Sequence, residues 1–213
     1  MIQIKICGVT TPEDVDVVAD AGANAIGFNF HPKSPRYVDP KAAEPLVRAL
    51  PSFLAPVGVF VEAPMRQAIA IGFQLGLRTL QTYTSPPDDD PFPFAHLPAF
   101  RVKDAASLQA IRQYVAGCAS FGRKPAAVLV DSFVPGEVGG TGKIAPWELL
   151  VGFDPGVPLV LAGGLTPDNV AEAIRLVKPK GVDVASGVES APGKKDPGKV
   201  RAFVKNARAA TQL

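Results

Sequence analysis

Two residues with reactive side chains each end a short apolar run of the sequence. Cys7 ends the run IQIKIC, and Asp131 ends the run AAVLVD. Side chains alternate between the two faces of a strand, so Lys5 shares a face with Cys7. A thiol accepts a proton only as its thiolate, and a carboxyl group above apolar neighbours keeps its proton to a higher pH. The pair can therefore move protons on a substrate; a buried structural cysteine and a capping aspartate are the alternatives.

Small and flexible residues follow two later apolar runs. Gly163 and Gly164 follow the run VPLVLA, while Ser186 and Gly187 lie at the end of the run GVDVAS and precede DPGKV. Glycine permits close approach of the backbone, and the amides of such turns and of a short helix beginning at Ser186 attract anions. These segments predict a site for a phosphate group, with tight turns that bind no ligand as the alternative.

Alternating elements must position these residues. Apolar or β-branched runs predict eight strands: 2–7, 25–30, 55–61, 78–83, 99–102, 126–131, 157–162 and 181–186. Amphipathic stretches between them predict helices at 12–22, 40–50, 64–76, 105–117, 145–152, 166–177 and 196–210. The first helix has clear signals, because Thr11 is placed to cap it, Pro12 suits its first position and Gly22 suits its end.

Eight strand–helix units in 213 residues predict a closed (β/α)₈ barrel, in which residues 1–213 form one domain. An open α/β sheet is the alternative. The prolines and acidic residues of 84–100 interrupt the rhythm, so the fourth helix should be short or irregular. His96 lies in this interval and is expected to be incidental rather than catalytic.

Composition restricts the class of partner. The hydrophobic content is 47%, the net charge is +2 and the basic residues are scattered, so neither nucleic acid nor an anionic membrane is an expected partner. The sequence has no targeting segment and no apolar run long enough to cross a bilayer, which predicts a soluble cytoplasmic protein. Cys7 and Cys118 stand in different contexts and are expected to be reduced thiols.

Seven short motifs in order carry a family resemblance over nearly the whole chain: KICG, SPRYV, VGVFV, LVDS, GGTGK, LAGGLTPDNV and GVDVASGVE. With these motifs the chain resembles the phosphoribosylanthranilate isomerase family of tryptophan biosynthesis. The resemblance implies an Amadori rearrangement of N-(5-phosphoribosyl)anthranilate to 1-(2-carboxyphenylamino)-1-deoxyribulose 5-phosphate. It implies a small phosphorylated substrate and no cofactor or metal.

The resemblance also assigns roles to individual residues. Cys7 matches the general base, Asp131 the general acid, and Arg36 of SPRYV the partner of the anthranilate carboxylate. The expected substrate-binding residues are completed by Gln81, Gly140, Gly142, Gly163, Gly164, Asp183, Ser186 and Gly187. Lys5 and Asp183 share the predicted interior, which favours a buried ion pair that supports the site.

The chain departs from the family pattern at several positions. Where the family usually has QLHG, this chain has Gln81, Thr82, Tyr83 and Thr84, so the histidine is lost. A different phosphosugar barrel enzyme would explain the glycine-rich segments, but not Cys7, Arg36 and Asp131 together. A catalytically silent phosphate-binding barrel is the other alternative, and the sequence is compatible with either a monomer or a homodimer.

Overall fold

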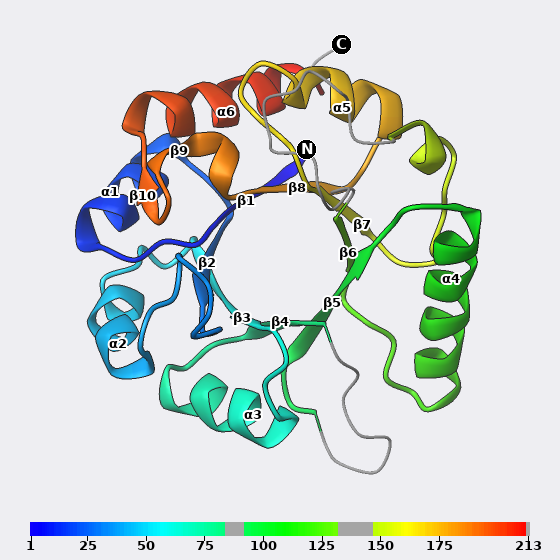
Figure 1. Cartoon of the computed structure of the whole chain (residues 1–213), viewed down its shortest axis with the longest axis horizontal. Coiled ribbons are helices and arrows are strands. Elements are labelled where there is room, and N and C mark those ends of the chain that lie inside the picture. Colours follow the sequence, from blue (N-terminus) through cyan, green and yellow to red (C-terminus); the bar gives the residue numbers. More distant parts are fainter. Residues whose placement is uncertain (84–91, 132–146, 212–213) are drawn as a thin grey trace.

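Eight parallel strands close into a barrel in the computed structural model, which describes residues 1–83, 92–131 and 147–211 (Figure 1). Each strand pairs with the next in sequence, and β8 pairs with β1. The strands are β1 Gln3–Cys7, β2 Ala25–Asn29, β3 Ala55–Phe60, β4 Thr79–Thr82, β5 Ala95–Arg101, β6 Val128–Asp131, β7 Leu159–Ala162 and β8 Gly181–Val184. The predicted (β/α)₈ barrel is confirmed.

Helices surround the barrel (Figure 1). They are α1 Pro12–Ala21, α2 Pro40–Arg48, α3 Met65–Gln74, α4 Ala105–Ser120, α5 Val170–Val177 and α6 Pro197–Ala209. The predicted signals of α1 are confirmed, because the Thr11 side chain accepts a hydrogen bond from the Asp14 amide at 3.2 Å and Gly22 has φ of 78°. A left-handed residue ends the helix here, and glycine adopts that conformation without a Cβ clash.

Three elements differ from the sequence-based expectation. Strand β5 begins at Ala95, four residues earlier than expected, because 95–98 pair with β4 despite Pro98. The stretch expected as a helix at 145–152 contains the 3₁₀ helix η1, Trp147–Leu150. A two-stranded hairpin, β9 Glu189–Ala191 and β10 Lys194–Lys195, was not expected. Most of the predicted irregular fourth helix lies outside the described residues, and 92–94 contain no helix.

The side chains of the strands form two layers. Ile4 and Ile6 of β1 are fully buried in the large cluster between barrel and helices. Leu97, Ala99, Leu129 and Ala162 form a second cluster, with Ala127 and Tyr83 packed against it. Leu129 belongs to this second cluster and has the same strand parity as Asp131. None of the helices in residues 1–83, 92–131 and 147–211 is long and apolar enough to cross a membrane.

His96 is a buried member of β5, and its imidazole Nε2 lies 2.9 Å from the Thr82 hydroxyl on β4. Burial lowers the pKa of His96 to about 4, from an ordinary value of 6.5. The residue is therefore neutral in the folded protein, whereas the unfolded chain takes up a proton below pH 6.5. His96 is also absent from the residues that line the cavity at the carboxyl ends of the strands.

Acidification should therefore destabilise the fold through His96. We expect the free energy of unfolding to fall by up to about 3 kcal/mol between pH 6.5 and 4 because of this residue. Above pH 6.5 the residue is neutral in both states and adds no pH dependence. Urea unfolding across this range checks the prediction, with His96→Gln as the comparison because glutamine is neutral throughout. The same pH dependence in both proteins would contradict it.

Candidate active site

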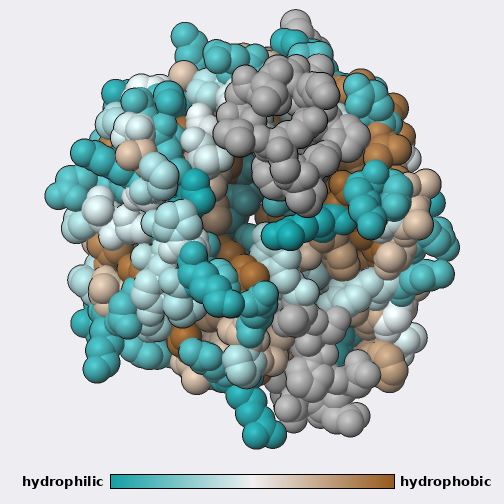
Figure 2. Space-filling view, viewed as in Figure 1, coloured by the Kyte–Doolittle hydropathy of each residue, from teal (hydrophilic) through white to brown (hydrophobic). Residues whose placement is uncertain are grey.

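A cavity of about 260 Å³ lies at the carboxyl ends of the strands, and the surface is hollowed near the centre of the ring (Figure 2). Nine of the predicted site residues line it: Cys7, Arg36, Gln81, Asp131, Gly163, Gly164, Asp183, Ser186 and Gly187. The other two, Gly140 and Gly142, lie outside the described residues. Asn29 and Tyr83 also line the cavity, and sequence reasoning gave neither a role. Catalytic residues of (β/α)₈ enzymes are found at this end of the barrel.

The predicted ion pair lies next to the cavity, which Asp183 lines. Lys5 Nζ on β1 lies 2.9 Å from Asp183 Oδ1 on β8, and both side chains are less than a tenth exposed. Burial alone would lower the pKa of Lys5, but the Asp183 carboxylate and the Cys7 thiol raise it above its ordinary value. Lys5 therefore stays charged, and it places a fixed positive charge beside the thiol.

Cys7 ends β1 in this charged environment and is 8% exposed. Gly27 on the neighbouring strand makes room for it, because a Cβ there would lie 2.8 Å from Cys7 Sγ and 3.1 Å from Lys5 Nζ. Burial raises the pKa of the thiol, and Lys5 opposes that rise by stabilising the thiolate. The net direction of the pKa shift is upward, so burial outweighs the effect of Lys5 in the free protein.

Asp131 ends β6 on the opposite side of the barrel, where it pairs in register with Arg101 of β5 and Ala162 of β7. Tyr83 lines the same cavity. Burial raises the pKa of Tyr83 to about 12, and the negative charge of Asp131 is the next largest cause. The carboxylate of Asp131 is thus close enough to influence the phenol electrostatically.

Arg36 reaches the cavity from the loop after β2. A Cβ at Gly8 would lie 2.6 Å from Arg36 Cδ, and Gly8 has φ of 76°. Glycine directly after Cys7 therefore lets the arginine lie against the end of β1. Arg36 donates from Nε and Nη2 to the two carboxylate oxygens of Glu189, at 2.8 and 2.7 Å. Sequence reasoning placed Glu189 in a motif but gave it no role.

The glycine-rich segments after β7 and β8 touch through their backbones. Gly163 and Gly164 have φ of 86° and 65°, and Ser186 begins the 3₁₀ helix η2, Ser186–Val188. A Cβ at Gly187 would lie 1.9 Å from the Leu165 carbonyl oxygen, which is closer than any real contact. The close approach of these two loops therefore requires glycine at 187.

A methyl group at position 187 should open this contact. We expect Gly187→Ala to weaken binding of inorganic phosphate by about 2 kcal/mol, because the backbone must shift and amide hydrogen bonds to the anion are lost. Calorimetric titration with phosphate measures the change. Gly117→Ala on α4 is the matched control, since a Cβ there meets nothing within 4 Å. Equal phosphate affinity in the two variants would contradict the predicted site.

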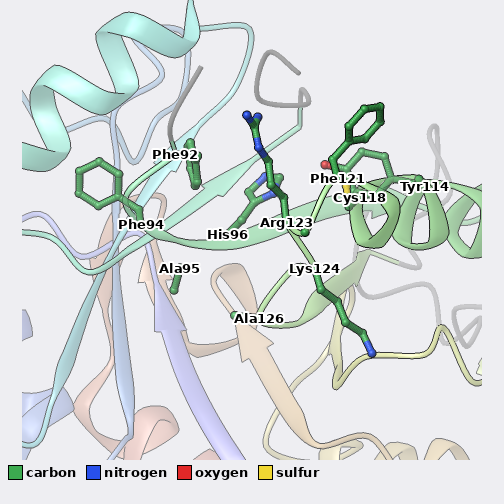
Figure 3. A pocket seen from close by; sticks show the side chains of 12 residues that line it. Phe92, Phe94, Ala95, His96, Tyr114, Cys118, Phe121, Arg123, Lys124 and Ala126 are labelled. Carbon is green, nitrogen blue, oxygen red and sulfur yellow. The ribbon is translucent and has the colours of Figure 1, made fainter. Parts of the chain in front are cut away.

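A second and larger cavity, of about 450 Å³, lies beside the amino ends of β5 and β6 and the end of α4. Figure 3 shows Arg123 extending beside His96 and Phe92, whereas Lys124 points away. None of the predicted site residues lines this cavity. Its larger volume is therefore no reason to prefer it over the smaller cavity, which Cys7, Asp131 and Arg36 line together. In residues 1–83, 92–131 and 147–211, no group of three or more His, Cys, Asp or Glu side chains could hold a metal ion.

Comparisons with known proteins identify the family of the chain. The sequence model of the family described as N-(5'-phosphoribosyl)anthranilate (PRA) isomerase matches residues 4–206. A relative from Trichlorobacter lovleyi, named N-(5'-phosphoribosyl)anthranilate isomerase, is 44% identical over 214 residues, which cover 99% of this chain and 100% of the relative.

Solved structures show the same fold. Phosphoribosyl anthranilate isomerase from Thermotoga maritima is 34% identical, with a TM-score of 0.85 and coverage of 98% of this chain and 100% of that protein. Another structure of such an isomerase is 32% identical, with a TM-score of 0.82 and coverage of 98% and 100%. The latter is a complex with reduced 1-(o-carboxyphenylamino)-1-deoxyribulose 5-phosphate.

Proposed function

The chain belongs to the N-(5'-phosphoribosyl)anthranilate isomerase family, and we propose that Cys7 is the base and Asp131 the acid of its reaction. The chain is an isomerase that converts N-(5-phosphoribosyl)anthranilate to 1-(2-carboxyphenylamino)-1-deoxyribulose 5-phosphate. The observation that carries the residue assignment is the single cavity that Cys7, Asp131 and Arg36 line together. The other phosphosugar barrel enzymes weighed from the sequence do not account for this combination.

The substrate has two anionic ends, and the cavity has a place for each. We infer that the phosphate binds the backbone amides around Gly163, Gly164 and Gly187, on the side of β7 and β8. The carboxylate of the anthranilate group then faces Arg36, whose planar fork matches a carboxylate. Fixing both ends holds the ribose between Cys7 and Asp131.

The reaction then needs two proton transfers at the ribose. Asp131 gives its proton to the furanose ring oxygen as the C1–O bond breaks, while the nitrogen lone pair forms the C1=N bond of an iminium ion. Cys7, as thiolate, takes the proton from C2, the electrons of that C–H bond form a C1=C2 double bond, and the C1=N π electrons return to nitrogen as its lone pair. The resulting enol becomes the 2-ketone by tautomerisation, with one proton lost from oxygen and one gained at C1.

Lys5 supports the base without touching the reacting carbon. Its ammonium lowers the pKa of the Cys7 thiol against the effect of burial, and Asp183 holds it in place at 2.9 Å. The thiolate that accepts the proton is therefore formed beside a fixed cation. Gln81 is buried and lines the same cavity, and we propose that it contacts the substrate.

An activity assay tests this function. With substrate generated in situ, the purified protein should consume the fluorescence of the anthranilate compound and form the ketone product. A different phosphosugar isomerase would leave the fluorescence unchanged but act on another sugar phosphate. A silent barrel would bind phosphate and convert nothing.

Loss of the Arg36 side chain should weaken substrate binding. We expect Arg36→Ala to cost about 2 to 4 kcal/mol in substrate affinity, because the carboxylate loses a charge-assisted pair in a half-buried cavity. Steady-state kinetics measure this as a higher KM and a lower kcat/KM. Arg201→Ala, on the exposed face of α6, is the matched control. Unchanged KM and kcat/KM would remove Arg36 from the site.

We further propose that residues 1–213 form one domain and that the enzyme acts in the cytoplasm. The barrel and α6 support the first point, because α6 contacts both α1 and β1. A monomer and a homodimer both remain compatible with the sequence. Sedimentation equilibrium of the purified protein distinguishes them.

A further inference from the structure

A buried carboxylate, that of Glu189, binds the Arg36 guanidinium. Glu189, at the start of β9, accepts both Nε and Nη2 of Arg36 in a two-point contact. The Glu189 side chain is 5% exposed and that of Arg36 is 22% exposed. Burial would raise the pKa of Glu189, but its hydrogen bonds to Arg36 and Lys195 lower it below the ordinary value. The carboxylate is therefore charged at neutral pH.

A second cation shares this carboxylate. Lys195 Nζ on β10 lies 2.8 Å from Glu189 Oε1 and donates to the Ala185 carbonyl at 3.3 Å. The Lys195 side chain has no exposed surface. A lysine is rarely buried in this way unless its charge is paired. Two cations on one anion leave the three residues with a net charge of +1.

The hairpin that carries Glu189 and Lys195 is tied to the loops around the cavity. The Thr10 hydroxyl, in the loop after β1, donates to the Gly193 carbonyl at 2.9 Å. The Lys195 amide donates to Asp14 of α1 at 3.1 Å. Gly193 itself approaches the loop of Arg36 so closely that a Cβ there would lie 2.7 Å from the Pro35 carbonyl oxygen. The hairpin is therefore a rigid support rather than a loose surface loop.

We propose that Glu189 and Lys195 are positioning residues that aim the Arg36 guanidinium at the substrate carboxylate and keep its surroundings positive. An arginine has five N–H donors, and Glu189 takes two of them. The two N–H groups of Nη1 and the second N–H of Nη2 remain, and one from each nitrogen suits a second two-point contact. Lys195 offsets the repulsion that Glu189 would otherwise exert on the incoming carboxylate. The proposal rests on the proposed role of Arg36.

The Glu189→Gln variant tests whether Glu189 orients the Arg36 guanidinium toward the substrate carboxylate. The amide offers one acceptor and presents N–H groups to two cations, so the two-point contact is lost. We expect KM to rise at least tenfold and kcat to change less than threefold, as for loss of a charge-assisted hydrogen bond. Glu172→Gln, on the exposed face of α5, is the matched control. A lower KM would mean that removing the negative charge matters more than aiming Arg36, and would overturn the proposal.

The Lys195→Met variant tests the contribution of the net positive charge of Arg36, Glu189 and Lys195. Methionine fills similar space, and the Arg36–Glu189 contact is kept, but the net charge falls from +1 to zero. We expect KM to rise about threefold to tenfold, with Lys205→Met on the exposed face of α6 as control. An unchanged KM would contradict the charge argument.

A mutant cycle separates positioning from a general structural role. In an Arg36→Ala background, Glu189→Gln should change KM less than twofold, because the group it positions is gone. The same loss in both backgrounds would overturn the proposal. If Glu189→Gln does not fold, Glu189→Asp replaces it, since it keeps the charge but is too short for the two-point contact. Failure of both to fold would show a purely structural role and also overturn it. Absence of isomerase activity in the unmutated chain would instead contradict the proposed function.

Discussion

Cys7→Ala should lower kcat by roughly 10² to 10⁴-fold, which is the contribution of a general base. The substrate is bound through its phosphate and carboxylate, so KM should change little. The side chain is small and Gly27 lies beside it, so the fold should survive the loss of the sulfur. Single-turnover kinetics with the substrate formed in situ measure the chemical step directly. Substrate should still bind to the variant and remain unconverted.

Cys118 supplies the matched control for this prediction. It is partly exposed on α4 and lines the second cavity rather than the first. Cys118→Ala should have nearly normal kinetics. Substrate should protect Cys7, but not Cys118, from alkylation, and the pH midpoint of Cys7 alkylation should lie above that of an ordinary thiol because burial raises its pKa. Near-normal turnover of Cys7→Ala would mean that the base is another group.

The sequence was sufficient for the barrel and for most of the cavity because both depend on regular patterns. Strand parity placed Lys5 and Cys7 on one face, and the structure confirms the pairing of Lys5 with Asp183 across β1 and β8. The position of Asp131 at the end of an apolar run placed it at the carboxyl end of β6. In a closed parallel barrel, all such strand ends face one cavity.

Other features depend on tertiary contacts that leave little local signal. The start of β5 at Ala95 is hidden by Pro93 and Pro98, and only pairing with β4 reveals it. Glu189 stood within the quoted GVDVASGVE motif, but nothing in that motif shows that it meets Arg36, 153 positions earlier in the chain. The hairpin of β9 and β10 is too short for periodicity to predict. The residues that support a site are thus harder to predict than those at strand ends.

The upward pKa shift of Cys7 bears on the ionisation state of the thiol before substrate binds. The ammonium of Lys5 favours the thiolate. Burial nevertheless outweighs it in the free protein, so the net shift of the thiol pKa is upward. With Cys7 as the proposed base, the reaction therefore draws on a thiolate that burial disfavours and the charge of Lys5 favours.

Asp131→Asn should reduce kcat by a similar factor, roughly 10² to 10⁴-fold, because an amide has the same shape but no acidic proton for the ring oxygen. The binding groups are untouched, so KM should stay near its normal value. Asp16→Asn, on the exposed face of α1, is the matched control and should be silent. A substrate whose ring is already open should react faster with Asp131→Asn than the cyclic substrate does, because it needs no acid for ring opening.

Tyr83 gives an independent measure of the same carboxylate. Burial and the charge of Asp131 together raise the pKa of Tyr83 to about 12. Asparagine removes the charge but not the burial, so spectroscopic titration of the tyrosines should show the Tyr83 pKa falling in Asp131→Asn. A lower kcat together with this shift would place the acid beside Tyr83 in the cavity. Normal turnover with the shift present would mean that Asp131 lies in the site but that another group protonates the ring oxygen.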